Sequence, residues 1–331
     1  MSNPIDDLAT LLDSDRAEIP APIDWTGHQV DIRAAFTGQK HPLDFVLPGL
    51  LAGTVGGLFS PGATGKTFLA LEVALGIAAP EAEAQLLNLH EPQTGRVVFL
   101  SKEDPPEVLW NRLNDLGHLI PSGAMAQVAR HLDVVSLLGT PMDIMENHPF
   151  LDVAEYCANS RLIIIDTLRR FHNRDENDNG AMTELIARLE ELAKHTGAAI
   201  LFLHHVSKNT ARNGTVDQFS GRGASALTDN ARWGAVLSTM TDDDAKGLAG
   251  TDEGYQDRLL QNQRRYVKLS FIKLNYYLPL EPRWFYRTDT GILVPKDLSS
   301  NTTNDVPIPE RQPDDDDSVT IYKGVRIPDD F

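Results

Sequence analysis

The chain has 331 residues, of which 41% are hydrophobic and 23% are charged, as in a soluble globular protein. This length is enough for one or two domains with a large core. The N-terminus lacks the basic and apolar segments of a secretory signal, and no run of about 18 apolar residues occurs. The single cysteine excludes an intramolecular disulfide and fits a reducing compartment. We therefore expect a cytoplasmic protein that does not span a membrane.

The net charge of −17 is concentrated in the two ends of the chain. Residues 1–28 carry a net charge of −5 and residues 297–331 carry −6, which leaves −6 for the rest. We predict an acidic N-terminal arm over residues 1–34, an ATPase domain over 35–296 and an acidic, Pro-rich disordered tail over 297–331. Because local patches decide what binds, the total charge does not exclude DNA as a partner.

Apolar runs separated by turn residues predict strands that alternate with helices. The predicted strands are 54–59, 96–101, 132–135, 162–166, 198–203, 233–239, 266–273, 284–287 and 292–294. The predicted helices are 68–78, 105–117, 150–158 and 182–193. The alternation indicates an α/β fold in which helices flank a mostly parallel central sheet, with additional C-terminal strands.

A phosphate-binding motif follows the first predicted strand and opens the first predicted helix. The motif consists of Ser60, Pro61, Gly62, Ala63, Thr64, Gly65, Lys66 and Thr67. Strand, Gly-rich turn, Lys-Thr and helix is the order of a P-loop, in which backbone N–H groups and the helix N-terminus surround phosphate oxygens. Lys66 can reach the β- and γ-phosphates and Thr67 can ligate Mg²⁺. Ser60 replaces the consensus glycine, but it is small enough for the turn. The motif predicts binding of a nucleoside triphosphate, ATP, with Mg²⁺.

Polar residues close three further apolar strands, and ligands of open α/β sheets bind at the carboxyl ends of strands. Asp166 has the Walker-B form and is suited to hold Mg²⁺. Thr167 follows it, so the base that activates water must come from elsewhere. Glu103 is our choice, and Asp104 is the alternative because neighbours on a strand point in opposite directions. His204 and His205 end another strand and are candidates for sensing the γ-phosphate.

Arginines in two later segments are candidates for further roles. Arg222 and Arg232 could act on the γ-phosphate, and an arginine supplied by a neighbouring subunit requires a ring or filament. Bases in two polar loops could follow a phosphate backbone, although composition alone slightly favours solvated surface loops. These candidate DNA-binding residues are Arg169, Arg170, Arg174, Lys208 and Arg212.

The chain resembles the plasmid RepA-type hexameric replicative DNA helicases, which have a RecA-like fold. The resemblance covers roughly residues 35–296 and rests on the P-loop and on several blocks of sequence. The blocks are Glu103-Asp104-Pro105-Pro106, Asp166-Thr167-Leu168-Arg169-Arg170-Phe171-His172, Phe202-Leu203-His204-His205, Arg232-Trp233 and Arg283-Trp284-Phe285.

The resemblance implies a homohexamer that hydrolyses ATP between subunits and moves 5′ to 3′ on single-stranded DNA. It assigns the catalytic glutamate to Glu103, the Walker-B acid to Asp166 and the arginine finger to Arg232, ahead of Arg222. It implies DNA-contacting loops near residues 169–180 and 206–222, and residues 209–220 depart from the family pattern. A replication initiator or a primase is a candidate partner. We expect a plasmid or phage-like replicative helicase; the alternatives are a RecA-like regulatory switch that acts on proteins and a nucleotide-binding scaffold.

Overall fold

The computed structural model describes residues 25–79, 93–206 and 222–298, and the chain divides into two compact units, Met1–Leu43 and Asp44–Phe331. The described part of the first unit contains the short helix η1 (Thr26–His28) and the helix α2 (Ile32–Thr37). Asp31 caps α2, since its side chain accepts a hydrogen bond from the Ala34 amide at 2.9 Å. Neither helix buries a side chain.

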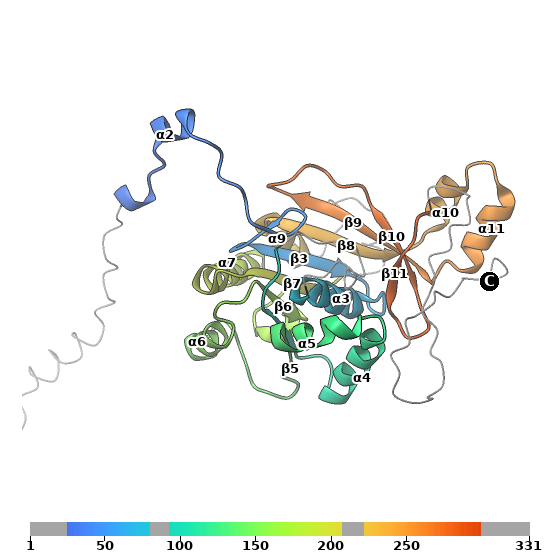
Figure 1. The fold of residues 1–331 in the computed structure, drawn as a ribbon, viewed down its shortest axis with the longest axis horizontal. Coiled ribbons are helices and arrows are strands. Elements are labelled where there is room, and N and C mark those ends of the chain that lie inside the picture. Colours follow the sequence, from blue (N-terminus) through green and yellow to red (C-terminus); the bar gives the residue numbers. More distant parts are fainter. Residues whose placement is uncertain (1–24, 80–92, 207–221, 299–331) are drawn as a thin grey trace, which may run out of the picture. The chain divides into compact units, whose positions relative to one another are not determined.

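The second unit is built on a nine-stranded sheet with the order β11-β10-β9-β8-β3-β7-β6-β4-β5 (Figure 1). Its strands are β3 (Val55–Ser60), β4 (Val97–Ser101), β5 (Leu132–Ser136), β6 (Leu162–Asp166), β7 (Ala199–His205), β8 (Trp233–Thr239), β9 (Tyr266–Leu274), β10 (Arg283–Arg287) and β11 (Leu293–Pro295). Strands β8, β3, β7, β6, β4 and β5 are parallel, and β9, β10 and β11 continue the sheet in antiparallel fashion. A separate antiparallel pair, β1 (Phe45–Leu47) and β2 (Leu50–Leu51), precedes β3.

Helices cover both faces of the parallel strands, which explains why most residues of β3, β4, β6 and β7 are apolar and buried. The helices of this unit are α3 (Lys66–Ala78), α4 (Pro106–Gly117), α5 (Ser122–His131), α6 (Asn147–Tyr156), η3 (Leu168–Phe171), α7 (Asn179–Thr196), α9 (Arg222–Asn230), α10 (Asp242–Ala249) and α11 (Glu253–Gln261). Alternate residues of β6 enter different cores: Leu162 and Ile164 pack with α3, whereas Ile163 and Ile165 pack with α6, α7 and α9. Such burial on both faces is the rule for parallel sheets.

The structure confirms the predicted fold class and differs from the predicted elements mainly in its helices. Each predicted strand and helix is present, with ends shifted by at most a few residues. Gly197, with φ 74°, caps the C-terminus of α7 as predicted. The helices α2, α5, α9, α10 and α11 were not predicted. The helices α10 and α11 form a small core of their own around Ala245 and Leu259. Within the described residues, no helix is long and apolar enough to cross a membrane.

Candidate functional site

The P-loop joins β3 to α3 and has the strained backbone that such a turn requires. Gly65 has φ 104° and Ala63 has φ 63°, both in the left-handed region that glycine tolerates best. The Thr64 hydroxyl donates to the Pro61 carbonyl at 2.9 Å and braces the turn. No side chain caps the start of α3, so its first-turn amides can receive an anion.

Lys66, Thr67 and Asp166 meet beneath the P-loop, although 99 residues separate Thr67 from Asp166 along the chain. Lys66 Nζ lies 3.4 Å from Asp166 Oδ1, and the Thr67 hydroxyl donates to Asp166 Oδ2 at 2.8 Å. Asp166 is fully buried at the end of β6; burial raises its pKa, and the Lys66 charge opposes that rise. A hydroxyl and a carboxylate held together beside a phosphate loop fit Mg²⁺, which prefers hard oxygen ligands.

Glu103 follows β4 and faces the same space from the other side. Its Oε1 atom lies 3.0 Å from His205 Nε2, at the end of β7. This hydrogen bond is the main cause of a lowered Glu103 pKa, and Lys66 adds to the effect against the cost of desolvation. The side chain is therefore an ionised carboxylate at neutral pH. The alternative base, Asp104, is instead bound to Arg112 at 2.5 Å.

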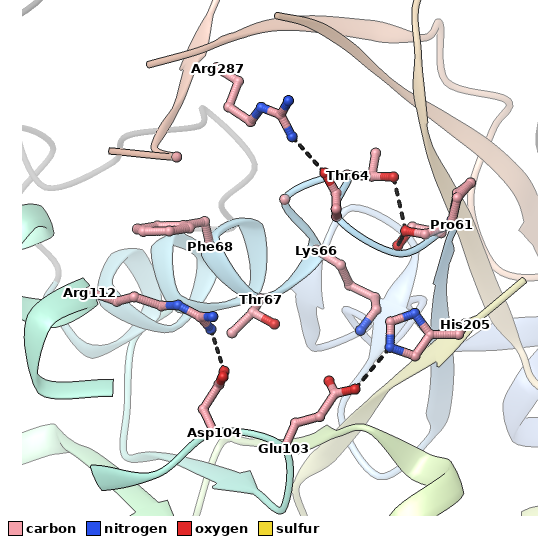
Figure 2. A pocket seen from close by; sticks show the side chains of 14 residues that line it. Pro61, Thr64, Lys66, Thr67, Phe68, Glu103, Asp104, Arg112, His205 and Arg287 are labelled. Carbon is pink, nitrogen blue, oxygen red and sulfur yellow. Dashed lines mark hydrogen bonds and ion pairs between the residues drawn. The ribbon is translucent and has the colours of Figure 1, made fainter. Parts of the chain in front are cut away.

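These side chains line a cavity of about 470 Å³, within the roughly 300–1,000 Å³ usual for small-molecule sites. Figure 2 shows Lys66 extended across it towards Glu103 and His205, with Phe68, Arg112 and Arg287 on the other side. We call Lys66, Thr67, Glu103 and His205 the strand-end wall, because they lie at or shortly after the carboxyl ends of parallel strands. We call Arg287 and Gly291 the hairpin wall, because they belong to the β10–β11 hairpin.

The two histidines that end β7 have different surroundings. His205 lines the cavity, whereas His204 does not and is buried beside Phe59. His204 Nδ1 lies 3.8 Å from Glu176 Oε1 in the loop after β6, too far for a hydrogen bond. Burial lowers the His204 pKa to about 4, so its ring is neutral at physiological pH. Within one chain, only His205 of this pair is in position to meet a nucleotide.

Arg232 lies at the edge of the sheet opposite its own P-loop. It immediately precedes β8, which runs parallel to β3, and the P-loop follows the carboxyl end of β3. Its guanidinium lies 3.9 Å from Glu190 of α7 and is half exposed. Arg222 begins α9, and its side chain is not described. Neither arginine is among the described residues that line the cavity.

The candidate DNA-binding residues fall partly in the described chain. Arg169, Arg170 and Arg174 are exposed in the loop that follows β6, at the same edge of the sheet as the P-loop. Arg169 Nε lies 3.3 Å from Glu176 Oε2, which joins this arginine to the carboxylate beside His204. Lys208 and Arg212 lie outside the described residues.

Four described residues that line the cavity were not predicted from the sequence: Phe68, Arg112, Arg287 and Gly291. Arg112 stands on the same face of α4 as its apolar residues and stacks over Phe68 at 5.6 Å from the ring centroid. A basic residue in the helix after the candidate glutamate was the available signal for Arg112. Arg287 carries no motif, and only the fold brings it to the P-loop.

A comparison with protein families agrees with this geometry. Residues 21–211 match the model of a family described as an AAA domain, which is more than half of the chain. The matched region contains the P-loop, Glu103, Asp166 and both histidines, and it ends before Arg232 and the β10–β11 hairpin.

Proposed function

The chain belongs to the AAA domain family of P-loop ATPases, and from that premise we propose that it is a replicative DNA helicase. In this proposal a homohexameric ring hydrolyses ATP and moves 5′ to 3′ along single-stranded DNA. The observation that carries the proposal is the exposed arginine loop after β6, which shares one edge of the sheet with the nucleotide cavity. The sequence resemblance to RepA-type helicases supports it independently.

The hydrolytic step follows from the strand-end wall. The P-loop amides and Lys66 bind the phosphates, and Glu103 accepts the proton of the attacking water as it adds to the γ-phosphorus. His205 orients the Glu103 carboxylate through their 3.0 Å hydrogen bond. Thr67 and Asp166 would hold a Mg²⁺ ion, which would supply neutralisation of the phosphate charge. The bond from the γ-phosphorus to the bridging oxygen breaks, and ADP leaves with inorganic phosphate.

The position of Arg232 supports assembly into a ring. At the far edge of the sheet, this arginine cannot serve the P-loop of its own subunit, but head-to-tail packing brings that edge to a neighbour's cavity. An arginine finger supplied in this way accelerates phosphoryl transfer by roughly 10³–10⁵-fold. In this arrangement each ATP is hydrolysed only when an adjacent subunit supplies its arginine, so that hydrolysis depends on assembly.

A chain of side chains supports coupling between ATP and DNA. His205 contacts Glu103 in the cavity, and its neighbour His204 lies beside Glu176, which pairs with Arg169 of the loop. A movement at the end of β7 on ATP binding therefore displaces groups on both sides of the strand. These side chains connect the loop that follows β6 with the proposed γ-phosphate site.

Strand displacement on a 5′-tailed duplex tests the proposal. We expect ATP-dependent unwinding by the wild type and none by Lys66→Ala, with a particle mass of six subunits in the same buffer. We expect Arg170→Glu to lower DNA-stimulated turnover by about tenfold, because it reverses a charge that faces the DNA phosphates. Arg130→Glu is the matched control, since Arg130 is exposed at the end of α5. It precedes the amino end of β5 and lies away from the carboxyl ends of the strands.

A regulatory switch that acts on proteins gives a different result in these assays. Turnover would then be indifferent to single-stranded DNA, and Arg170→Glu would match the wild type. ATP hydrolysis without any unwinding would contradict the helicase proposal and leave the assignment as an ATPase in place.

A further inference from the structure

The β10–β11 hairpin is anchored on the P-loop and on the helix that follows it. Arg287 Nη1 donates to the Ala63 carbonyl at 2.6 Å, and the Leu293 amide donates to Glu72 Oε1 at 2.9 Å on α3. Gly291 has φ 101°, and a Cβ atom there would lie 2.7 Å from the Phe68 ring, so no larger residue fits this contact. The hairpin therefore forms a fixed wall of the nucleotide cavity.

The charge of Arg287 is balanced differently from that of the other basic groups in the cavity. Lys66, Arg112 and His205 each lie beside a carboxylate, from Asp166, Asp104 and Glu103 respectively. Among the residues that the structure describes, Arg287 donates only to the main-chain carbonyls of Ala63 and Arg264, the second at 3.1 Å.

The acid nearest to Arg287 in the hairpin is engaged elsewhere. Asp289 pairs with Arg265 at 2.6 Å. Among the described residues that line the cavity, Arg287 is thus the cation without an acidic partner. An unbalanced guanidinium at the mouth of a phosphate site is ready for an anionic ligand.

We propose that Arg287 binds a phosphate group of the nucleotide in its own subunit. A guanidinium forms stronger, charge-assisted hydrogen bonds to phosphate oxygens than to a neutral carbonyl, and its planar fork suits two oxygens at once. The Ala63 carbonyl holds the side chain at the rim of the cavity, so little ordering is needed when the phosphate arrives. The inference rests on nucleotide binding, which follows from the family, and not on DNA unwinding.

The proposal extends the nucleotide site beyond the region that matches the family model. That region ends at residue 211, whereas the hairpin wall comes from residues 283–295. In this chain the antiparallel extension of the sheet becomes part of the ATPase centre. The same hairpin also contacts α3, through the hydrogen bond from the Leu293 amide to Glu72.

Titration of the full-length protein with ADP, a non-hydrolysable ATP analogue and adenosine, without DNA, tests the proposal. We expect Arg287→Ala to weaken binding of ADP and the analogue by about 10- to 100-fold and to leave adenosine binding unchanged. Arg287→Lys should recover part of the affinity because it keeps the charge. Arg264→Ala is the matched control, since that exposed side chain neighbours Arg287 and lies outside the cavity lining.

Arg287→Gln removes the positive charge but keeps a polar side chain, whose amide nitrogen stops near the position of the arginine Nε and does not reach the Ala63 carbonyl. We expect this variant to bind ADP as poorly as Arg287→Ala. Wild-type affinity in either variant would overturn the proposal, and so would an equal loss of adenosine binding. Because these titrations contain no DNA, they give a clear result even if the protein fails to unwind a duplex.

Discussion

The two walls of the nucleotide cavity differ in how their charges are balanced. In the strand-end wall each basic group has a carboxylate beside it, such as Glu103 for His205 at 3.0 Å. In the hairpin wall the hydrogen bonds of Arg287 go only to carbonyl oxygens, within the part of the chain that the structure describes. A wall that carries its own carboxylates is suited to hold a metal ion and accept a proton, whereas a wall with an unbalanced cation is suited to attract phosphate. The strand-end wall is thus suited to both chemistry and phosphate binding, whereas the hairpin wall is suited to binding alone.

The buried titratable groups behind the two walls also differ. Behind the strand-end wall, burial lowers the pKa of His204 to about 4 and that of His172 to about 4. Behind the hairpin wall, burial raises the pKa of Glu72 well above its usual range. In each case desolvation favours the neutral form of the group. Acidification should therefore lower the stability contributed by the two histidines and raise the stability contributed by Glu72.

The largest effect should come from the base in the strand-end wall. We expect Glu103→Gln to lower ATP turnover by about 10²–10⁴-fold, since the amide cannot accept a proton from water. Nucleotide affinity should stay near the wild-type value, because the P-loop and Arg287 are untouched. Single-turnover phosphate release and ADP titration measure the two quantities.

The neighbouring carboxylate provides the matched control. Asp104 is bound to Arg112 at 2.5 Å, so we expect Asp104→Asn to lower turnover by less than about tenfold. If Asp104→Asn removes turnover and Glu103→Gln does not, the assignment of the base is reversed.

The sequence was sufficient to predict the strand-end wall, because its residues lie in local patterns. The apolar run 162–165 followed by Asp166 predicts a buried strand with a polar end, and the motif of residues 60–67 predicts the turn. Since parallel strands end at one edge, Glu103 could be assigned to the same site without knowing the strand order. The structure brings these residues together as expected.

The hairpin wall could not be predicted, because it depends on contacts that are remote in sequence. Arg287 reaches Ala63 across 224 residues, and this contact follows from the antiparallel strands β9 to β11, which extend the sheet beyond β8. Strand periodicity marks Arg287 only as a residue at the end of a short strand. The helices α10 and α11 were missed for a related reason, since their apolar residues pack only with each other and with nearby strands.

The next largest effect is a loss of folding stability at acidic pH that comes from His204, which is buried behind the strand-end wall. The folded-state pKa of His204 is about 4, below the ordinary 6.5, so the unfolded chain binds an extra proton between these values. The free energy of unfolding should fall as pH decreases from 6.5 to 4, by up to about 3 kcal/mol for this group. His204→Gln should flatten the curve measured by urea denaturation. His148, which is 90% exposed, provides the matched control, and an unchanged slope in His204→Gln would contradict the buried neutral ring.

A smaller effect is expected from the partner of the base. His205→Asn removes the hydrogen bond that chiefly lowers the Glu103 pKa, so this pKa should rise towards its usual value. The acidic limb of the turnover profile should then move to higher pH. We also expect turnover at neutral pH to fall by about tenfold, since the carboxylate loses its orientation. A uniform loss of turnover with an unshifted profile would show that His205 acts in another way.

The smallest effect should come from Glu72, which anchors the hairpin wall. Its pKa is raised by burial, so the folded state binds the extra proton, and stability from this group is lost as pH rises above the unfolded value of about 4.5. Glu72→Gln keeps an oxygen that accepts the Leu293 amide and removes the ionisable group. We expect the variant to match the wild type near pH 4.5 and to have the higher free energy of unfolding at pH 8. Glu72→Ala, which also loses the hydrogen bond and leaves a cavity, should be less stable than the wild type at both pH values. If Glu72→Gln instead lost stability as pH rose, the opposite pH responses of the two walls would have to come from other groups.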